Sequence, residues 1–262
     1  MTKFLYKTAL VTGASSGIGK AFAYELAKKG VNLVLTARSQ NKLEEIKNDL
    51  KSKYQIEVTY LVADLSDPNA SQAIYDQLSE LHINIDLLIN NAGIGKWSNF
   101  LDQSIKTYEE MIQLNISSLV KLCQLFIPNM LKNKNGGIIN IASTGALQPC
   151  PYIAVYCASK AFVLNFSESL YGEYLDKGIT VTAICPGNTE TGFQKEANAD
   201  TSGMSFETPE MVAKQSLDAL IKKKNNKIIG FGNRMQSILP RLLPRKTVIT
   251  IVKNMMNKKV NS

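Results

Sequence analysis

Short runs of β-branched and apolar residues alternate along this chain with longer stretches that space apolar residues three and four positions apart. The short runs predict strands buried on both faces, and the longer stretches predict helices with one apolar side. Strands are expected at residues 8–12, 32–37, 57–62, 87–90, 137–141, 180–184 and 227–230, and helices at about 17–29, 41–53, 71–81, 108–132, 159–176 and 209–222. This alternation favours an α/β fold, a doubly wound parallel sheet of seven strands with helices on both faces.

The pattern runs through the chain without a linker, an internal repeat or a low-complexity segment. With 262 residues, 45% of them hydrophobic and 20% charged, we expect residues 1–262 to form a single domain. The most apolar stretch, residues 119–131, is interrupted by Lys121 and Pro128, so no run is expected to span a bilayer. The first residues lead straight into a strand and not into a signal-peptide core, so a cytoplasmic location is expected.

Cysteine and histidine usage argues against a metal site. Cys123, Cys150, Cys157 and Cys185 show no spacing typical of metal ligands, which predicts small buried thiols in a reducing compartment. The single histidine, His82, falls in an expected surface turn, which also argues against a Ser-His-Asp triad.

Positive charge is concentrated near the C-terminus. Eleven lysines and arginines and no acidic residue follow Asp218, and because the net charge is only +8, residues 1–218 carry −3. Apolar residues recur there at helical spacings, at Met235, Ile238, Leu239, Leu242 and Leu243 and again at Val248, Ile251, Val252, Met255 and Met256. Residues 231–262 are therefore expected to form a basic amphipathic C-terminal extension. It could pack on its own domain, on a partner subunit or on a membrane surface.

A glycine-rich turn follows the first predicted strand. Gly13-Ala14-Ser15-Ser16-Gly17-Ile18-Gly19 connects that strand to an apolar-periodic helix. Glycines in a strand-turn-helix let the backbone approach a pyrophosphate, which then rests at the helix N-terminus. The turn predicts a nucleotide site that includes Gly13, Ser15, Ser16, Gly17, Ile18 and Gly19.

A second constellation follows the fifth predicted strand. Tyr156 and Lys160 are four residues apart, which puts both on one face of a helix, and Ser143 lies thirteen residues earlier at the strand end. The Tyr-x3-Lys spacing alone is weak, because Tyr24 and Lys28 share it within the first helix. Only the later pair follows a strand end. A nearby lysine lowers the pKa of a phenol, so the set suits proton transfer to an oxygen.

These features together resemble the short-chain dehydrogenase/reductase family over residues 8 to about 230. The resemblance implies a Rossmann-type fold and hydride transfer between a nicotinamide cofactor and an alcohol or carbonyl carbon. It also implies a catalytic tetrad of Asn115, Ser143, Tyr156 and Lys160. In the family, the asparagine backbone holds a water that relays protons to the lysine, which itself binds the nicotinamide ribose.

The end of the second strand predicts which cofactor is used. An NAD site places an acidic residue there to hold the ribose 2′-hydroxyl. This chain has Ala37 and then Arg38 and Ser39, so a guanidinium can bind a 2′-phosphate and NADP(H) is expected.

The resemblance places further cofactor contacts at three strand ends. Asp64 and Leu65 would contact the adenine, and Asn91, Ala92 and Gly93 would brace the sheet beside the cofactor. Pro186 and Gly187 begin a loop that closes over the nicotinamide, with Thr189 and Thr191 as candidate contacts. The C-terminal extension departs from 3-oxoacyl-carrier-protein reductases and is more similar to DltE-like and hydroxysteroid-dehydrogenase-like members.

The leading hypothesis is an NADP(H)-dependent oxidoreductase for a small-molecule carbonyl or alcohol substrate. The substrate is expected to be apolar or lipid-like, and the protein is expected to form a homodimer or homotetramer. Trp97, Phe100, Tyr152, Phe193 and Phe206 are candidates for an apolar substrate pocket. The alternative is a catalytically silent NADP(H)-binding sensor, against which the complete Ser-Tyr-Lys set argues. Nucleic acid is not expected as a partner, because residues 231–262 contain one aromatic residue and no reader motif.

Overall fold

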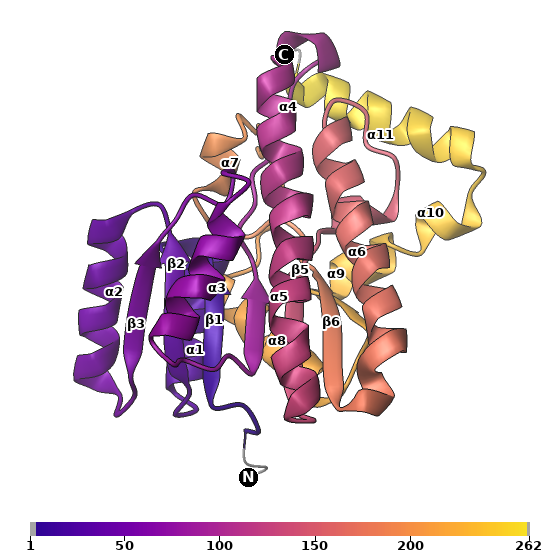
Figure 1. Cartoon of the computed structure of the whole chain (residues 1–262). Coiled ribbons are helices and arrows are strands. Elements are labelled where there is room, and N and C mark those ends of the chain that lie inside the picture. The colour runs from indigo at the N-terminus through magenta and orange to yellow at the C-terminus, as the bar shows by residue number, and fades with distance from the viewer. Residues whose placement is uncertain (1–3, 261–262) are drawn as a thin grey trace.

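A computed structural model describes residues 4–260 and has a seven-stranded parallel sheet at its centre (Figure 1). The strands are β1 (Thr8–Thr12), β2 (Asn32–Ala37), β3 (Val58–Val62), β4 (Leu87–Asn90), β5 (Gly136–Ile141), β6 (Ile179–Cys185) and β7 (Asn226–Ile228). They lie in the order β3-β2-β1-β4-β5-β6-β7, and all six neighbouring pairs are parallel. The predicted doubly wound α/β fold is confirmed.

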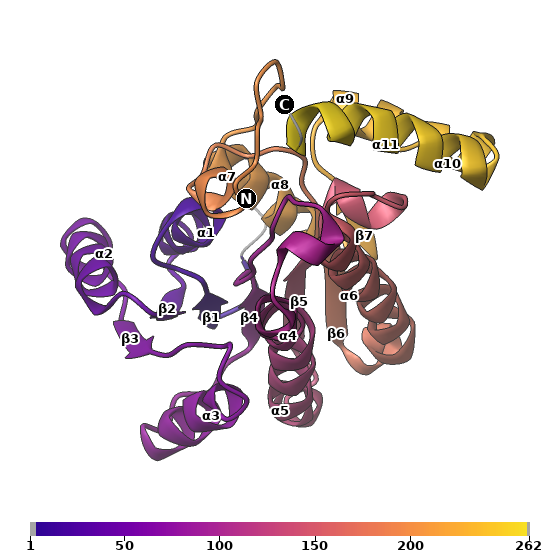
Figure 2. The ribbon, with the colours of Figure 1, turned by 90° about the horizontal axis from the view of Figure 1, so that it is seen from above.

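Helices cover both faces of this sheet (Figure 2). One face carries α1 (Gly17–Ala27), α2 (Gln40–Lys53) and α8 (Pro209–Ile221), and the other carries α3 (Ala70–Glu80), α5 (Ser118–Lys132) and α6 (Ala154–Tyr174). Helix α4 (Ile105–Ile112) extends α5 beyond the sheet (Figure 1). The short helices η1 (Phe100–Asp102), η3 (Thr144–Leu147), η4 (Leu175–Lys177) and α7 (Phe193–Glu196) lie in the connections. Leu33 and Leu35 belong to the first core layer and Val34 to the second, because successive strand residues point to opposite faces.

Some element bounds differ from the predicted ones. Helix α6 begins at Ala154, five residues before the predicted start at residue 159. The β-branched Val155 and the aromatic Tyr156 are weak helix formers, but packing of Cys157 into the interior overrides their propensity. Strand β7 ends at Ile228, two residues early, because Gly230 adopts a φ of +82° and turns the chain into another helix.

Helices α4 and α5 form one continuous helix through η2 (Gln113–Ser117), a π-helical turn. By length and mean hydropathy, Ile105–Lys132 could cross a membrane, so the expectation that no stretch is long enough was wrong. Leu122, Phe126 and Met130 of this helix are buried in the core against the sheet. Such packing is typical of the core helix of a doubly wound fold.

The C-terminal extension forms α9 (Phe231–Gln236), α10 (Leu239–Leu242) and α11 (Arg245–Val260), while residues 261–262 lie outside the described range. Val248, Val252 and Met256 of α11 are buried in a small apolar cluster with residues of the main domain, as their spacing predicts. The predicted partners Ile251 and Met255 are instead about half exposed. Helix α10 and the start of α11 project from the body of the molecule (Figures 1 and 2).

Candidate active site

A cavity of about 730 Å³ lies at the carboxyl ends of the strands. The chain order reverses between β1 and β4, which is where open α/β sheets bind ligands. Almost all of the predicted site residues line this cavity, namely Gly13, Ser15, Ser16, Gly17, Ile18, Arg38, Ser39, Asp64, Leu65, Asn91, Ala92, Gly93, Ser143, Tyr156, Lys160, Pro186, Gly187, Thr189 and Thr191. The two exceptions, Gly19 and Asn115, lie behind its wall. Within residues 4–260, no three His, Cys, Asp or Glu side chains gather as metal ligands would.

The glycine turn leaves its backbone open to the cavity. Gly13 and Gly17 have φ angles of +65° and +53°, a region that side chains disfavour. A Cβ atom on Gly13 would lie 2.8 Å from Asn91 Nδ2, and one on Gly17 would lie 2.8 Å from Thr191 Cγ2. Gly19 packs against the Gly13 carbonyl, where a Cβ atom would clash, so it holds α1 against the turn. The Ser16 side chain makes no capping hydrogen bond to α1, so that helix start can receive an anion.

A hydrogen-bonded bracket ties the end of β4 to the end of β1. Asn91 Nδ2 donates to the Thr12 carbonyl at 2.9 Å, and Thr12 Oγ1 accepts from the Asn91 and Ala92 amides at 2.9 and 3.0 Å. These bonds fix the segment that leads through Gly93 along the cavity wall.

Positive charge lies at the cavity end next to β2 and β3. Arg38 is exposed there, beside Asp64, whose carboxylate accepts from the Ser66 amide at 3.0 Å and the Ser66 hydroxyl at 2.7 Å. Partial burial raises the pKa of Asp64, but the Ser66 bonds and the charge of Arg38 outweigh it and lower the pKa overall. Lys42, in the first turn of α2, also lines the cavity. Sequence reasoning missed it, although it lies one helical turn beyond Ser39.

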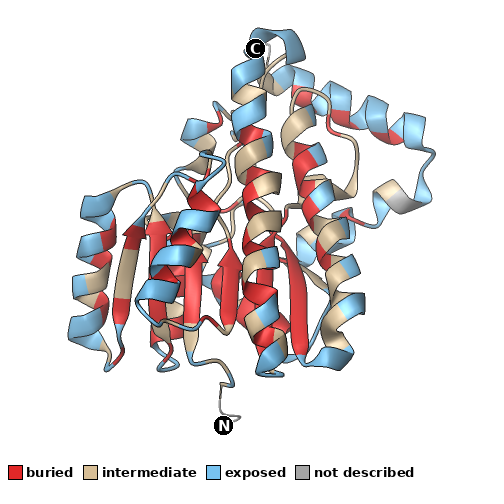
Figure 3. Cartoon of the chain, in the orientation of Figure 1, coloured by how far each residue is buried: buried red, intermediate tan, exposed pale blue. Residues whose placement is uncertain are grey.

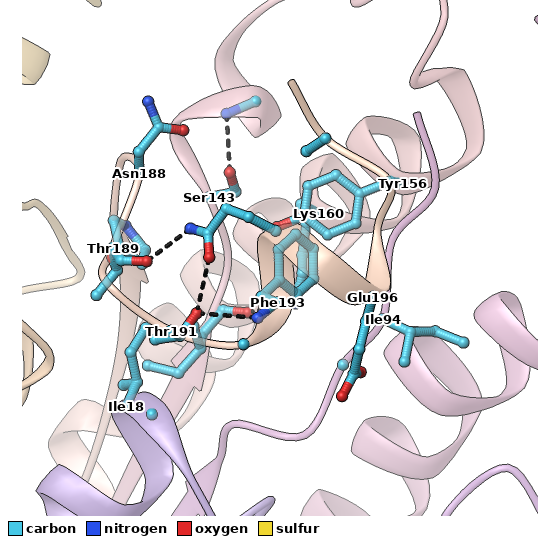
Figure 4. A pocket seen from close by; sticks show the side chains of 18 of the residues that line it. Ile18, Ile94, Ser143, Tyr156, Lys160, Asn188, Thr189, Thr191, Phe193 and Glu196 are labelled. Carbon is cyan, nitrogen blue, oxygen red and sulfur yellow. Dashed lines mark hydrogen bonds between the residues drawn. The ribbon is translucent and has the colours of Figure 1, made fainter. Parts of the chain in front are cut away.

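Ser143, Tyr156 and Lys160 meet at the opposite end of the cavity (Figure 4). Ser143 follows β5, its Oγ accepts from the Gly145 amide at 3.1 Å, and its hydroxyl lies near that of Tyr156. Burial raises the pKa of Tyr156, and the neighbouring Ser143 hydroxyl works against that rise. The two hydroxyls therefore lie where both can hydrogen-bond the same ligand atom.

Lys160 is a buried cation one helical turn from Tyr156. Its side chain is 5% exposed, its Nζ donates to the Ile141 carbonyl at 2.8 Å, and it lies 5.8 Å from the centre of the Tyr156 ring. Burial lowers the pKa of Lys160 from 10.5 to about 8. Because a buried charge is unfavourable without partners, this ammonium is poised to bind a hydroxyl or an anion.

Asn115 lies in the π-helical turn and is 1% exposed. Its side chain accepts from the Ile94 amide at 3.0 Å and donates to the Ile94 carbonyl at 2.9 Å and to Ser159 Oγ at 3.0 Å. A Cβ atom on Gly93 would lie 3.1 Å from Asn115 Oδ1 and 3.2 Å from Lys160 Nζ. The structure thus brings Asn115 close to Lys160, and the helix is also irregular there.

The loop after β6 is held in shape by its own side chains (Figure 4). Thr191 Oγ1 accepts from the Phe193 amide at 3.2 Å, and Gln194 Nε2 donates to the Thr189 carbonyl at 2.6 Å. The Phe193 ring lies 5.4 Å from the Tyr156 ring. A Cβ atom on Gly95 would lie within 3 Å of both rings, so this contact requires glycine.

The aromatic residues predicted to line a substrate pocket lie only partly at this cavity. Trp97 and Phe193 line it, whereas Phe100, Tyr152 and Phe206 do not. Phe100 instead stacks on Tyr108, and the Tyr152 hydroxyl donates to Asn257 of α11 at 2.8 Å. The lining residues from the C-terminal helices are Asn233, Gln236, Val252, Met255 and Met256. Only the amphipathic pattern of those helices could have suggested them.

Comparisons with known proteins find relatives over most of the chain. A family model described as short chain dehydrogenase matches residues 7–202. The very-long-chain 3-oxoacyl-CoA reductase of Rattus norvegicus is 34% identical over 257 residues, which are 95% of this chain and 81% of the relative. Hydroxysteroid dehydrogenase-like protein 1 of Gallus gallus is 40% identical over 181 residues, which are 68% of this chain and 54% of the relative.

A solved structure, the short-chain dehydrogenase from Sphingobium yanoikuyae in complex with NADPH, has a TM-score of 0.82 and 30% sequence identity. The match covers 92% of this chain and 94% of that one, so it extends over nearly the whole fold. With the family match over residues 7–202, this chain belongs to the short-chain dehydrogenase/reductase family of oxidoreductases.

Proposed function

We propose that this chain is an NADP(H)-dependent oxidoreductase that interconverts a ketone or aldehyde and its alcohol, on a substrate with a long apolar chain such as a 3-oxoacyl thioester. One observation carries the proposal. The hydroxyls of Ser143 and Tyr156 and the buried ammonium of Lys160 share one cavity with the glycine turn at the start of α1. The proposed proton donor and the proposed pyrophosphate-binding turn therefore line the same cavity.

The residues along the cavity fit a dinucleotide. Gly13, Gly17 and the start of α1 would hold the pyrophosphate, because side chains are excluded there and the helix dipole favours an anion. Thr36 Oγ1 lines the cavity and has no hydrogen-bond partner among the described residues, so a ligand could satisfy it. Arg38 and Lys42 would bind a 2′-phosphate, which favours NADP(H) over NAD(H).

The chemistry assigned to the chain is proton transfer and orientation. When bound, the reduced nicotinamide supplies a hydride to the carbonyl carbon. Tyr156 donates its hydroxyl proton to the carbonyl oxygen as that oxygen gains negative charge, and Ser143 donates a hydrogen bond to the same oxygen. Lys160 stabilises the phenolate left on Tyr156, because its positive charge lies one helical turn away. Asn115 holds the Ile94 backbone in place behind Lys160.

The substrate class is inferred from the wall opposite the glycine turn. Trp97, Phe193, Val252 and Met256 give this wall an apolar surface, and flexible methionines adapt to different chains. The similarity to a very-long-chain 3-oxoacyl-CoA reductase supports an acyl chain over a small polar sugar.

The test follows NADPH oxidation by the purified protein with long- and short-chain 3-oxoacyl-CoA. We expect kcat/KM to rise with chain length, because each buried methylene contributes about 0.8 kcal/mol, roughly a factor of four. Equal values for both chain lengths would contradict the substrate class. Binding of NADPH without turnover of any ketone, aldehyde or alcohol would favour the sensor alternative.

Cofactor preference is tested separately with Arg38→Ala and Lys42→Ala. A charge-assisted phosphate contact is worth about 1.5–3 kcal/mol, so kcat/KM for NADPH should exceed that for NADH about 10- to 100-fold in the unmodified protein. Each variant should reduce this ratio and leave activity with NADH unchanged. Lys51→Ala removes a charge from the other end of α2 and is the matched control. An unmodified protein that uses both cofactors equally would contradict the assignment.

A further inference from the structure

We propose that the C-terminal arm, residues 231–260, forms a docking surface for an anionic lipid membrane beside the opening of the cavity. Large apolar side chains are exposed along the arm, namely Phe231, Met235, Ile238, Leu239, Leu242, Leu243, Ile249, Ile251 and Met255. Leu242 is 74% exposed and Leu239 is 56% exposed. Exposed apolar side chains in such number mark a surface that contacts something else.

The concentration of these residues on the arm is specific to it. Residues 231–260 expose nine large apolar side chains, whereas residues 4–230 expose ten over a segment more than seven times longer. Figure 3 shows that most of α11 is exposed apart from the turns that face the domain. The arm is therefore only half covered by its own domain.

The charge of the arm selects an anionic partner. Arg234, Arg245, Lys246, Lys253 and Lys258 are all exposed, and the sequence contains no acidic residue after Asp218. An amphipathic helix with lysine and arginine beside exposed leucine and isoleucine is the composition that binds at a membrane interface. Anionic headgroups complement the cations, and the acyl boundary accepts the apolar side chains.

A second copy of the chain fits this surface less well. Two arms placed face to face would bring the same cations together, and nothing on either arm carries a negative charge to compensate them. A lipid surface meets both requirements at once. Dimer formation through the arm is accordingly a separate outcome that the experiment below can detect.

Helix α11 connects the docking surface to the cavity. Val248, Val252 and Met256 pack toward the main domain, and Val252 and Met256 also line the cavity. Met255 lines the cavity and is 50% exposed, so the cavity reaches the surface at this helix. Lys259 Nζ donates to the Ser202 carbonyl at 2.9 Å, which anchors the end of α11 to the loop over the cavity. An apolar substrate could pass from the lipid past Met255, an inference that rests on the proposed function.

The experiment measures co-sedimentation of the full chain with vesicles, in the absence of cofactor and substrate. We expect binding to phosphatidylcholine–phosphatidylglycerol vesicles, weaker binding to pure phosphatidylcholine, and a decrease with salt. Arg245→Gln with Lys246→Gln should weaken partition about 30-fold, since each cation near an anionic surface contributes a factor of about five. Leu239→Glu with Leu242→Glu should abolish binding.

Matched controls place the same changes elsewhere. Leu81→Glu changes a leucine that is 54% exposed at the end of α3, and Lys222→Gln with Lys224→Gln removes two charges at the end of α8. Both should bind like the unmodified chain. Because the changed side chains are exposed, NADPH binding should be retained in every variant.

The proposal is overturned if the unmodified chain does not bind anionic vesicles, or if arm and control variants bind equally. It is also overturned if the chain is a dimer in solution that the leucine variants dissociate, because the occupant is then a second copy. Since the assay needs neither NADPH nor substrate, failure of docking is distinguishable from failure of the proposed function.

Discussion

Tyr24 of α1 and Tyr156 of α6 are each followed four residues later by a lysine, but the two pairs lie in opposite surroundings. On α1, the Tyr24 hydroxyl donates to Asp49 at 2.6 Å, and Lys28 pairs with Glu25 at 2.5 Å. On α6, Lys160 is buried, and no carboxylate within residues 4–260 forms an ion pair with it.

The difference shows what the spacing can and cannot mean. Four residues on a helix only place two side chains on the same face. Carboxylates raise the pKa of Lys28 and hold Tyr24 in a surface network, whereas burial lowers the pKa of Lys160 and leaves its charge to act on its neighbours. The pair that lies at the carboxyl end of a parallel strand is therefore the candidate for catalysis, whereas the pair of Tyr24 and Lys28 has a structural role.

The largest expected effect is on turnover. Tyr156→Phe should lower kcat by about 100-fold or more, the usual range for loss of a general acid, and leave NADPH affinity nearly unchanged. Tyr24→Phe makes the same chemical change on α1 and should keep kcat within about twofold. Steady-state kinetics and cofactor fluorescence measure both quantities. If Tyr156→Phe retained turnover within a few-fold, Tyr156 would not be the proton donor.

A smaller effect is expected when the lysines are changed. If Lys160 binds the cofactor ribose as the family resemblance implies, Lys160→Met removes a charge-assisted hydrogen bond worth about 1.5–3 kcal/mol, and NADPH affinity should fall about 10- to 100-fold. The pH at which alcohol oxidation becomes half-maximal should also rise, because the Tyr156 phenolate loses its neighbouring cation. Lys28→Met should change neither quantity. Equal effects of the two variants would remove the distinction between the pairs.

The lysines should also affect stability with opposite signs. In the cofactor-free protein the pKa of Lys160 is about 8, below its value of 10.5 in the unfolded chain. Between pH 8 and pH 10.5 the unfolded chain binds more protons than the folded one, so the free energy of unfolding rises with pH. The destabilisation that comes from burying the charged Lys160 is therefore fully present below pH 8. Lys160→Met should therefore stabilise the protein near neutral pH by about 3 kcal/mol, and this gain should disappear as the pH approaches about 10.5.

Lys28 supplies the control for that measurement. Glu25 raises the pKa of Lys28, so its stabilising contribution is complete below the unfolded pKa and is lost as the pH rises through the folded one. Lys28→Met should thus destabilise the protein slightly near neutral pH. Urea unfolding over a range of pH gives the change in free energy of unfolding for each variant. If both substitutions changed this free energy in the same direction near neutral pH, the assigned environments of the two lysines would be contradicted.

The smallest effect concerns Tyr24 alone. Its hydroxyl bond to Asp49 contributes on the order of 1 kcal/mol, so Tyr24→Phe should lower Tm by roughly 2–4 °C. Thermal unfolding followed by circular dichroism measures this change. A Tm equal to that of the unmodified protein would show that the bond to Asp49 makes no net contribution to stability, because water replaces it equally well in the unfolded chain.

The first half of the fold and the cofactor side of the cavity were predictable because their signals are local. Strands β1, β2 and β4 have the predicted bounds, and each buries apolar residues on both faces. Gly13 and Gly17 have the positive φ angles that only glycine adopts readily, so the need for glycine is visible in the sequence itself.

The rest depended on contacts between distant segments. Met255 and Met256 line the same cavity as Tyr156, although they lie more than 90 residues later in the sequence. A periodic pattern of apolar residues does not show against which surface a helix packs. Lys42 was missed because a lysine in the first turn of an exposed helix carries no local signal. The start of α6 was misplaced because tertiary packing overrode the helix propensity of Val155 and Tyr156.

The π-helical turn at Gln113–Ser117 makes the long helix sensitive to its exact number of residues. One residue corresponds to about 100° of rotation and 1.5 Å of rise along an α-helix. A deletion of one residue in this turn would therefore restore regular helix but rotate α4 relative to α5, and Met111 would leave the core, where it is now 1% exposed. A change of side chain at Asn115 would break its hydrogen bonds to Ile94 and Ser159 but would not rotate α4 relative to α5. The fold is thus expected to tolerate substitution in this turn better than a change in its length.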